Sequence, residues 1–235
     1  GAETLVRLRG SDHVLVPPLL FVPLAAELGL LGQLTEQVIH QACAAAACWR
    51  ATGGPRWVSV NAPPSWLTPH APDYLTDRLA AYDLPGAALT LEVTEDESMN
   101  IDATQAAVLS DLRGAGLLVA IDDFGTGYAG LGSFRSLPAD LVKIDQSFVA
   151  AMLDGDDDTA LVRSILDLVH RFGKKAIAEG IETPEPYATL AAMGCDYAQG
   201  YLVGRPVPAG QMATTPFCLP SSANPREDDR SGSPR

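Results

Sequence analysis

Short apolar runs alternate with amphipathic stretches along most of the chain. Runs long enough for buried strands occupy residues 57–61, 89–93, 117–122, 141–144 and 175–178. Helical spacing is clearest between the last two runs, where apolar residues recur three or four positions apart from Leu161 to Phe172. Repeated strand–helix–strand units predict a parallel sheet with helices on its faces.

The same patterns predict the remaining elements. Further helices are expected at residues 21–28, 31–49, 65–82, 103–115 and 184–193, and further strands at 3–8 and 198–203. The strands are nearly all apolar, which is typical of parallel strands that are covered on both faces.

Two α/β architectures fit this pattern, an open doubly wound sheet and a (β/α)8 barrel. No G-x-G-x-x-G sequence follows the first strand, which weakens the dinucleotide-binding form of the open sheet. The size of the chain and the number of repeats favour the barrel.

Composition narrows the class of protein. The chain has 235 residues, of which 47% are hydrophobic, so a sizeable core can form. A net charge of −13 argues against binding a nucleic-acid polymer, which requires many Lys and Arg side chains. No apolar run is long enough to span a membrane, and no signal peptide begins the sequence. We therefore expect a cytoplasmic domain without membrane contact.

The domain is predicted to occupy residues 1–215. The tail from Ser221 is rich in Ser, Pro, Arg and Asp and has almost no apolar residues, so residues 216–235 are expected to be disordered. Four scattered cysteines lack zinc-ligand spacing and are too few for a disulfide scaffold of this size.

Polar residues stand at the ends of, or within, these apolar strands. They are Asn61, Glu92, Asp122, Asp123, Lys143 and Glu179. One buried acid could be a paired structural residue, but acids on consecutive parallel strands of a barrel converge on one mouth. Crowded carboxylates repel each other unless cations neutralise them, and an oxygen-rich site suits Mg²⁺ or Mn²⁺. Lys143 could offset the acids, or orient a water or phosphate oxygen, or do both.

The most specific motif is D-D-F-G-T-G-Y at residues 122–128. Its glycines permit backbone conformations with positive φ. Such a loop can fold over a site and present both carboxylates to metal ions.

Eight motifs occur in an order that resembles the EAL-domain family of cyclic-di-GMP phosphodiesterases. They are E-T-L-V-R at 3–7, P-L-L-F-V-P-L-A-A at 18–26, S-V-N at 59–61, L-E-V-T-E at 91–95, D-D-F-G-T-G-Y at 122–128, V-K-I-D at 142–145, A-E-G-I-E-T at 178–183 and Q-G-Y at 199–201. The resemblance implies a (β/α)8-like barrel with one antiparallel strand near its start. It also implies hydrolysis of cyclic di-GMP to linear 5'-pGpG with two Mg²⁺ or Mn²⁺ ions.

The resemblance also assigns roles to residues. The implied metal ligands are Glu3, Asn61, Glu92, Asp122, Asp123 and Glu179. Lys143 would hold or activate the attacking water, with Glu179 as a candidate general base. Arg7 would contact a substrate phosphate, and Glu95 would brace the loop at 122–128. Glu182 and Gln199 would line the site. The family allows a homodimer, for which the sequence indicates no interface.

Three features depart from the family pattern. Thr4 replaces the signature Ala, and the helix entry ends in Ala25-Ala26 with Glu27 one place late. The chain begins two residues before Glu3, so we expect the family's first strand to be absent and Glu3 to lie on a frayed terminus.

The leading hypothesis is an active phosphodiesterase. The alternatives are a cyclic-di-GMP receptor or protein-interaction module with weak or no activity, and an unrelated barrel enzyme with a carboxylate metal site.

Overall fold

The computed structural model describes residues 1–10, 14–98, 101–125, 135, 137–153 and 155–212. Its contacts divide the chain into two compact units. Unit 1 contains Gly1–Lys143 and the segment from Pro206, and unit 2 contains Ile144–Arg205. The predicted disordered tail and residues 126–128 of the D-D-F-G-T-G-Y motif lie outside the described residues.

Unit 1 is built on parallel strands. In order across the sheet they are β1 (Ala2–Glu3), β4 (Val58–Asn61), β5 (Leu89–Thr94), β6 (Leu118–Phe124) and β7 (Leu141–Ile144). The pairings of β1 with β4, β4 with β5, and β5 with β6 are all parallel. Their side chains form the core of the unit, in which Val60, Leu91 and Val142 are fully buried.

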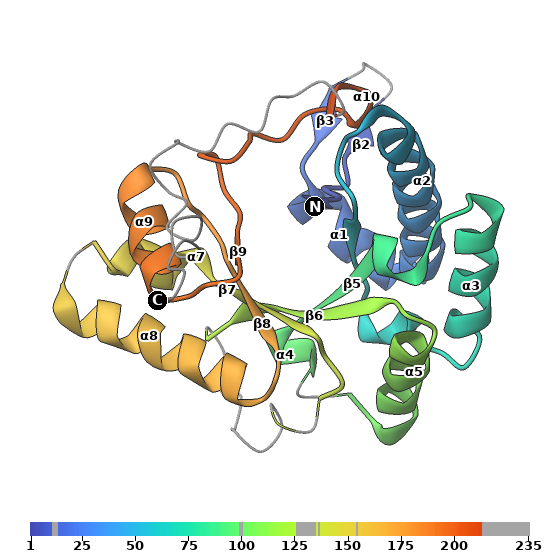
Figure 1. Ribbon diagram of the computed structural model, residues 1–235. Coiled ribbons are helices and arrows are strands. Elements are labelled where there is room, and N and C mark those ends of the chain that lie inside the picture. Colours follow the sequence, from blue (N-terminus) through green and yellow to red (C-terminus); the bar gives the residue numbers. More distant parts are fainter. Residues whose placement is uncertain (11–13, 99–100, 126–134, 136, 154, 213–235) are drawn as a thin grey trace, which may run out of the picture. The chain divides into compact units, whose positions relative to one another are not determined.

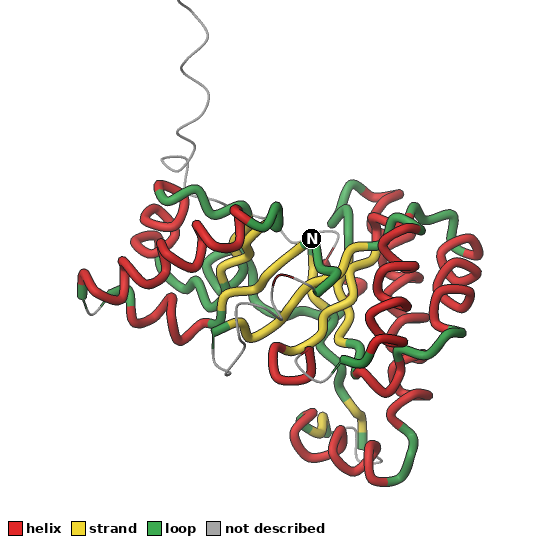
Figure 2. The backbone as a smooth tube through the Cα atoms, turned by 90° about the horizontal axis from the view of Figure 1, so that it is seen from below, coloured by secondary structure: helices red, strands yellow, loops and turns green. Residues whose placement is uncertain are grey.

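The helices of unit 1 lie outside these strands. Among the residues that the structure describes, the longer helices are α1 (Pro18–Glu27), α2 (Leu31–Thr52), α3 (Ala71–Ala81) and α5 (Ala103–Gly114), and the shorter ones are α4 (Glu95–Ser98) and α10 (Ala209–Met212). Helices α2, α3 and α5 lie along one side of the strands (Figures 1 and 2). Two short strands, β2 (Leu8–Arg9) and β3 (Leu15–Val16), form a separate antiparallel pair ahead of α1.

Unit 2 continues the alternation of strands and helices. It contains α7 (Gln146–Ala151), α8 (Asp156–Arg171), β8 (Lys175–Ala178), α9 (Pro184–Ala192) and β9 (Tyr197–Ala198). Strands β8 and β9 are parallel, with Ile177 paired with Tyr197. The last residue of β7 belongs to this unit, and its carbonyl oxygen accepts a hydrogen bond from the N–H of Glu179 at 3.1 Å.

Most predicted elements are confirmed, and the strands at 141–144 and 175–178 have the predicted bounds. The strand predicted at 3–8 is wrong, because β1 ends at Glu3 and regular pairing resumes only in β2. The helix predicted at 65–82 is a 3₁₀ turn, Pro64–Trp66, followed by α3. The strand predicted at 198–203 is also wrong, since the chain turns after Ala198.

The turn after β9 has a clear physical cause. Gly200 has φ of +152°, and a Cβ atom there would clash with the backbone of Ile181. Only glycine tolerates this conformation and this close approach, so the chain leaves the sheet at that point. Within the described parts of the chain, no helix has both the length and the apolar character needed to cross a membrane.

Candidate functional site

Lys143 lies at the centre of a buried acidic cluster in unit 1. Its side chain is 1% exposed, and its Nζ atom lies 2.9 Å from Oδ1 of Asp122, 3.1 Å from Oε2 of Glu92 and 3.7 Å from Oε2 of Glu3. One ammonium group balances one carboxylate, so three carboxylates leave an excess of negative charge. The charge of the cluster therefore favours additional cations.

The strand register explains why these side chains meet. Glu92 is paired with Ala120, and Asp122 follows Ala120 by two residues. Alternate residues project from the same face of a strand, so Glu92 and Asp122 share a face. Glu3 joins them from β1, where it is paired with Ser59.

Glu3 is held in place despite lying near the start of the chain. The N–H of Ala2 donates to the carbonyl oxygen of Trp57 at 3.1 Å, and the N–H of Thr4 donates to that of Ser59 at 2.9 Å. Ala2 is only 8% exposed. The expectation of a frayed terminus at Glu3 is therefore wrong.

Burial dominates the electrostatics of Glu92. This residue is 2% exposed, and loss of solvent raises the pKa of its carboxyl from 4.5 to about 7. The Lys143 ammonium group opposes that rise in pKa, whereas the carboxylates of Glu3 and Asp122 reinforce it. At neutral pH the cluster thus relieves part of its excess negative charge by holding a proton, which a cation could replace.

The turn after β6 is fixed by two carboxylates. Asp123 has φ of +55°, and its N–H donates to Oδ1 of Asp122 at 3.0 Å. Gly125 has φ of +103°, and its N–H donates to Oε2 of Glu95 at 2.6 Å. Glu95 is 3% exposed, so this hydrogen bond to a charged group is shielded from water. The glycine conformation expected from the motif is confirmed at Gly125.

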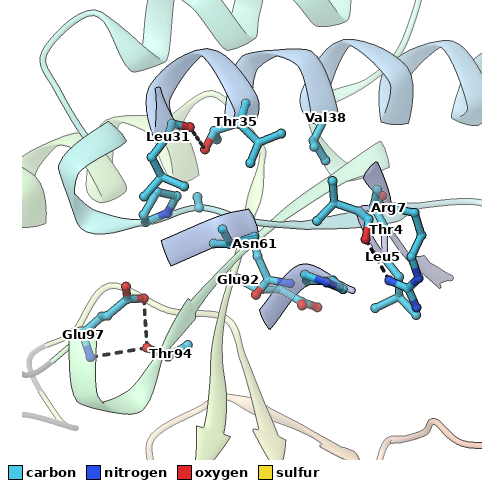
Figure 3. A pocket seen from close by; sticks show the side chains of 16 residues that line it. Thr4, Leu5, Arg7, Leu31, Thr35, Val38, Asn61, Glu92, Thr94 and Glu97 are labelled. Atoms are coloured by element: carbon cyan, nitrogen blue, oxygen red, sulfur yellow. Dashed lines mark hydrogen bonds between the residues drawn. The ribbon is translucent and has the colours of Figure 1, made fainter. Parts of the chain in front are cut away.

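A cavity of about 360 Å³ adjoins the acidic cluster within unit 1. Asn61 and Glu92, which are partners in the strand register, lie together in it, and Arg7 comes from the N-terminal segment (Figure 3). The Arg7 side chain is exposed and donates from Nη1 to the carbonyl oxygen of Val6 at 2.8 Å. Polar groups and a carboxylate therefore line one part of the cavity.

Apolar residues from α1 and α2 form another part of the cavity wall, and they are not among the predicted site residues. They are Pro18, Val22, Leu31, Leu34 and Val38. Leu31, Leu34 and Val38 recur at helical spacing, which predicts one apolar face of a helix but not that this face lines a cavity. A ligand of this cavity would meet both an apolar surface and charged groups.

Unit 2 carries the remaining predicted site residues. Glu179 directly follows β8 and is half-buried. The N–H of Gln199 donates to the carbonyl oxygen of Ala178 at 2.8 Å, so Gln199 and Glu179 lie at the same end of β8 and β9. Glu182 is exposed. Gly180 has φ of +67°, and a Cβ atom there would clash with Gln146.

Comparison with known proteins identifies the family. The EAL domain model matches residues 1–206. The chain belongs to the EAL domain family. It is 36% identical over 215 residues to the bifunctional diguanylate cyclase/cyclic di-GMP phosphodiesterase MucR of Pseudomonas aeruginosa, covering 90% of this chain and 31% of MucR. It is also 35% identical over 214 residues to the oxygen sensor protein DosP of Escherichia coli, covering 90% of this chain and 27% of DosP.

Solved structures of EAL proteins share the fold. The MucR phosphodiesterase in complex with c-di-GMP superposes with a TM-score of 0.80 at 36% identity, covering 89% of this chain and 85% of that one. A manganese/c-di-GMP complex of Klebsiella pneumoniae BlrP1 gives a TM-score of 0.72 at 28% identity, covering 85% and 54% of the two chains. The predicted family and its α/β, TIM-like barrel fold class are thus confirmed. This EAL chain spans less than a third of the length of MucR or DosP.

Proposed function

We propose that this EAL domain hydrolyses cyclic di-GMP to linear 5'-pGpG in a reaction that requires Mg²⁺ or Mn²⁺. The observation that carries the proposal is the cluster of Glu3, Glu92 and Asp122 around Lys143, next to a cavity that contains Arg7. Support also comes from relatives, because MucR is named as a cyclic di-GMP phosphodiesterase and both MucR and BlrP1 are described in complexes with c-di-GMP.

The donor chemistry fits divalent metal ions. The proposed ligands are carboxylate and amide oxygens, which Mg²⁺ and Mn²⁺ prefer, from Glu3, Asn61, Glu92, Asp122, Asp123 and Glu179. Burial first, and then the carboxylates of Glu3 and Asp122, raise the pKa of Glu92, so a bound cation would stabilise its ionised form. When bound, two such ions would activate water and stabilise charge on the phosphate.

The resemblance to the family gives each remaining residue a role. Arg7 would bind a phosphate oxygen of the substrate through its guanidinium group, which suits phosphate geometry. Lys143 would orient the attacking water, since its Nζ atom already lies 2.9 Å from Asp122. Glu179 would take a proton from that water as general base. The resemblance implies that Glu182 and Gln199 also line the site.

Glu95 would act through the backbone rather than on the substrate. Its carboxylate holds the N–H of Gly125 at 2.6 Å, only two residues after Asp123. This bond would keep the turn after β6 in the conformation that presents Asp122 and Asp123. We assign Glu95 as a positioning residue.

The test is direct. Purified protein is incubated with cyclic di-GMP and Mn²⁺, and linear 5'-pGpG is measured by chromatography. We expect product from the wild type, none after addition of EDTA, and none from Asp122→Asn. The matched control is Glu185→Gln, which changes an exposed acid in the first turn of α9 and should leave turnover unchanged. Binding without product would instead indicate a cyclic-di-GMP receptor.

A further inference from the structure

Unit 1 contains a second cavity, next to that of the candidate site. Its volume is about 540 Å³, and residues from the end of α1, the start of α2, the 3₁₀ turn and the start of α3 line it. It shares one lining residue, Leu31, with the cavity of the candidate site. Helices α2 and α3 are joined here, because the Tyr74 hydroxyl donates to the carbonyl oxygen of Glu36 at 3.2 Å. The volume lies in the range of small-molecule sites, roughly 300–1,000 Å³.

Hydrogen-bond donors gather on one side of this cavity. Helix α2 begins without a side chain that caps its first N–H groups, and Leu31 and Gly32 of its first turn line the cavity. Trp66 lines the cavity too and is only 7% exposed. Its indole N–H has no acceptor among the described residues, although a buried Trp N–H usually has one. The free indole N–H and the uncapped helix start together favour an anionic ligand group, such as a carboxylate.

Gly32 leaves the space in front of this helix start open. A Cβ atom on Gly32 would have no atom within 4 Å, and the residue does not have a positive φ that would require glycine. Glycine is a poorer helix former than alanine, so it does not strengthen α2. Its effect is to let a ligand group approach the backbone N–H groups closely.

A carboxylate lies one helical turn further along α2. Glu36 follows Gly32 by four residues, so both lie on the same face of the helix. Helical side chains lean toward the N-terminus, which brings the Glu36 carboxylate over the turn that contains Gly32. In the described part of the chain Glu36 has no salt bridge, and Arg78 lies instead over the Tyr74 ring, 5.3 Å from its centre. An ammonium group in the cavity would give Glu36 a charged partner.

Aromatic rings form the wall beside these polar groups. The rings of Trp66 and Tyr74 meet edge to face, with centroids 6.0 Å apart and planes at 81°, and both residues line the cavity. Such a wall suits an aromatic side chain. A simple anion would have to face Glu36, and a simple cation would face the helix start. A ligand that carries both charges satisfies both sides.

We propose that this cavity binds a free α-amino acid with an aromatic side chain. The ligand carboxylate accepts hydrogen bonds from the N–H groups of the first turn of α2 and from Trp66. The ligand ammonium group donates to Glu36, and the ring of the ligand packs against Tyr74. No residue of the acidic cluster takes part, so the site does not depend on the proposed function.

Isothermal titration calorimetry with L-phenylalanine tests the site. The wild type should bind it. Two analogues keep the ring but lose one charge: 3-phenylpropanoate has no ammonium group, and 2-phenylethylamine has no carboxylate. Each should bind at least ~10-fold more weakly, because a hydrogen bond to a charged group is lost.

Three substitutions locate the ligand. Gly32→Leu fills the open space and should abolish binding. Trp66→Phe keeps a ring but removes the N–H, and Glu36→Gln removes the charge, so each should weaken binding by about 10-fold. The matched control is Gly114→Leu at the last residue of α5, where an added Cβ atom would also have no atom within 4 Å, and it should bind as the wild type does. Circular dichroism should show that all four variants are folded.

The outcomes that contradict the proposal are equally clear. A wild type that does not bind L-phenylalanine, or that binds 3-phenylpropanoate as tightly, would overturn it. Undiminished binding by a folded Gly32→Leu variant would place the ligand elsewhere and would also overturn it. Glu36 is exposed, so Glu36→Gln should fold even if Gly32→Leu does not, and an unchanged affinity in Glu36→Gln would refute the assigned ammonium contact.

Discussion

Replacing Glu92 by Gln should change how the stability of the metal-free protein depends on pH. Burial raises the pKa of Glu92 from 4.5 to about 7 in the folded protein. Between these two values the folded state holds a proton that the unfolded state has released, so the free energy of unfolding falls as pH rises. At about 1.4 kcal/mol per pH unit, the loss amounts to about 3 kcal/mol by neutral pH, and it persists at higher pH.

Urea unfolding in EDTA, from about pH 5 to about pH 8, measures this effect. The Gln side chain cannot ionise, so the free energy of unfolding of Glu92→Gln should not show this fall with pH. Relative to the wild type, it should therefore rise by about 3 kcal/mol over that range. With Mn²⁺ at high pH the wild type should instead be more stable than Glu92→Gln, because an ion that binds the folded wild type stabilises it. A difference between the two proteins that stays constant with pH would refute the electrostatic account of the cluster.

Three further predictions follow from the same contacts. Lys143→Met should leave the three carboxylates without their cation, lowering metal-free stability by about 3–5 kcal/mol in urea unfolding and abolishing 5'-pGpG formation in the chromatographic assay. Glu95→Gln should weaken the hydrogen bond from Gly125 and reduce turnover, with substrate affinity changing less; equal turnover would exclude the positioning role. Cys48 is exposed, whereas burial raises the pKa of Cys195 to about 11, so a thiol reagent near neutral pH should modify Cys48 quickly and Cys195 slowly. In a Cys218→Ser background, which removes the cysteine of the C-terminal tail, loss of the fast phase in Cys48→Ser checks this assignment.

The strands and the acidic cluster could be predicted because their signals are local. Apolar runs such as 141–144 mark strands buried on both faces, and period-two alternation sets which side chains share a face. In the parallel register of β5 and β6, Glu92 and Asp122 project from the same face of the sheet.

The N-terminal segment and the apolar cavity wall could not be predicted in the same way. Residues 3–8 have a strand-like composition, yet pairing with β4 stops at Glu3, because tertiary contacts decide where a strand ends. Val22 and Leu31 look like ordinary core residues in the sequence, and only the packing of α1 and α2 places them in a cavity. The resemblance to the family supplied the residues of unit 2, and their roles stay predictions.

The internal lysine of the acidic cluster has a consequence for how the domain responds to its supply of metal ions. A structural zinc finger unfolds without its ion, because nothing else offsets the ligands. Here Lys143 is a permanent counter-ion, bonded into β7 and unable to dissociate. We therefore expect the protein to stay folded when the metal is removed. A fall in the concentration of metal ions would then inactivate the protein reversibly, without unfolding it and exposing it to proteases. Circular dichroism before and after EDTA, followed by recovery of activity with Mn²⁺, would show this directly.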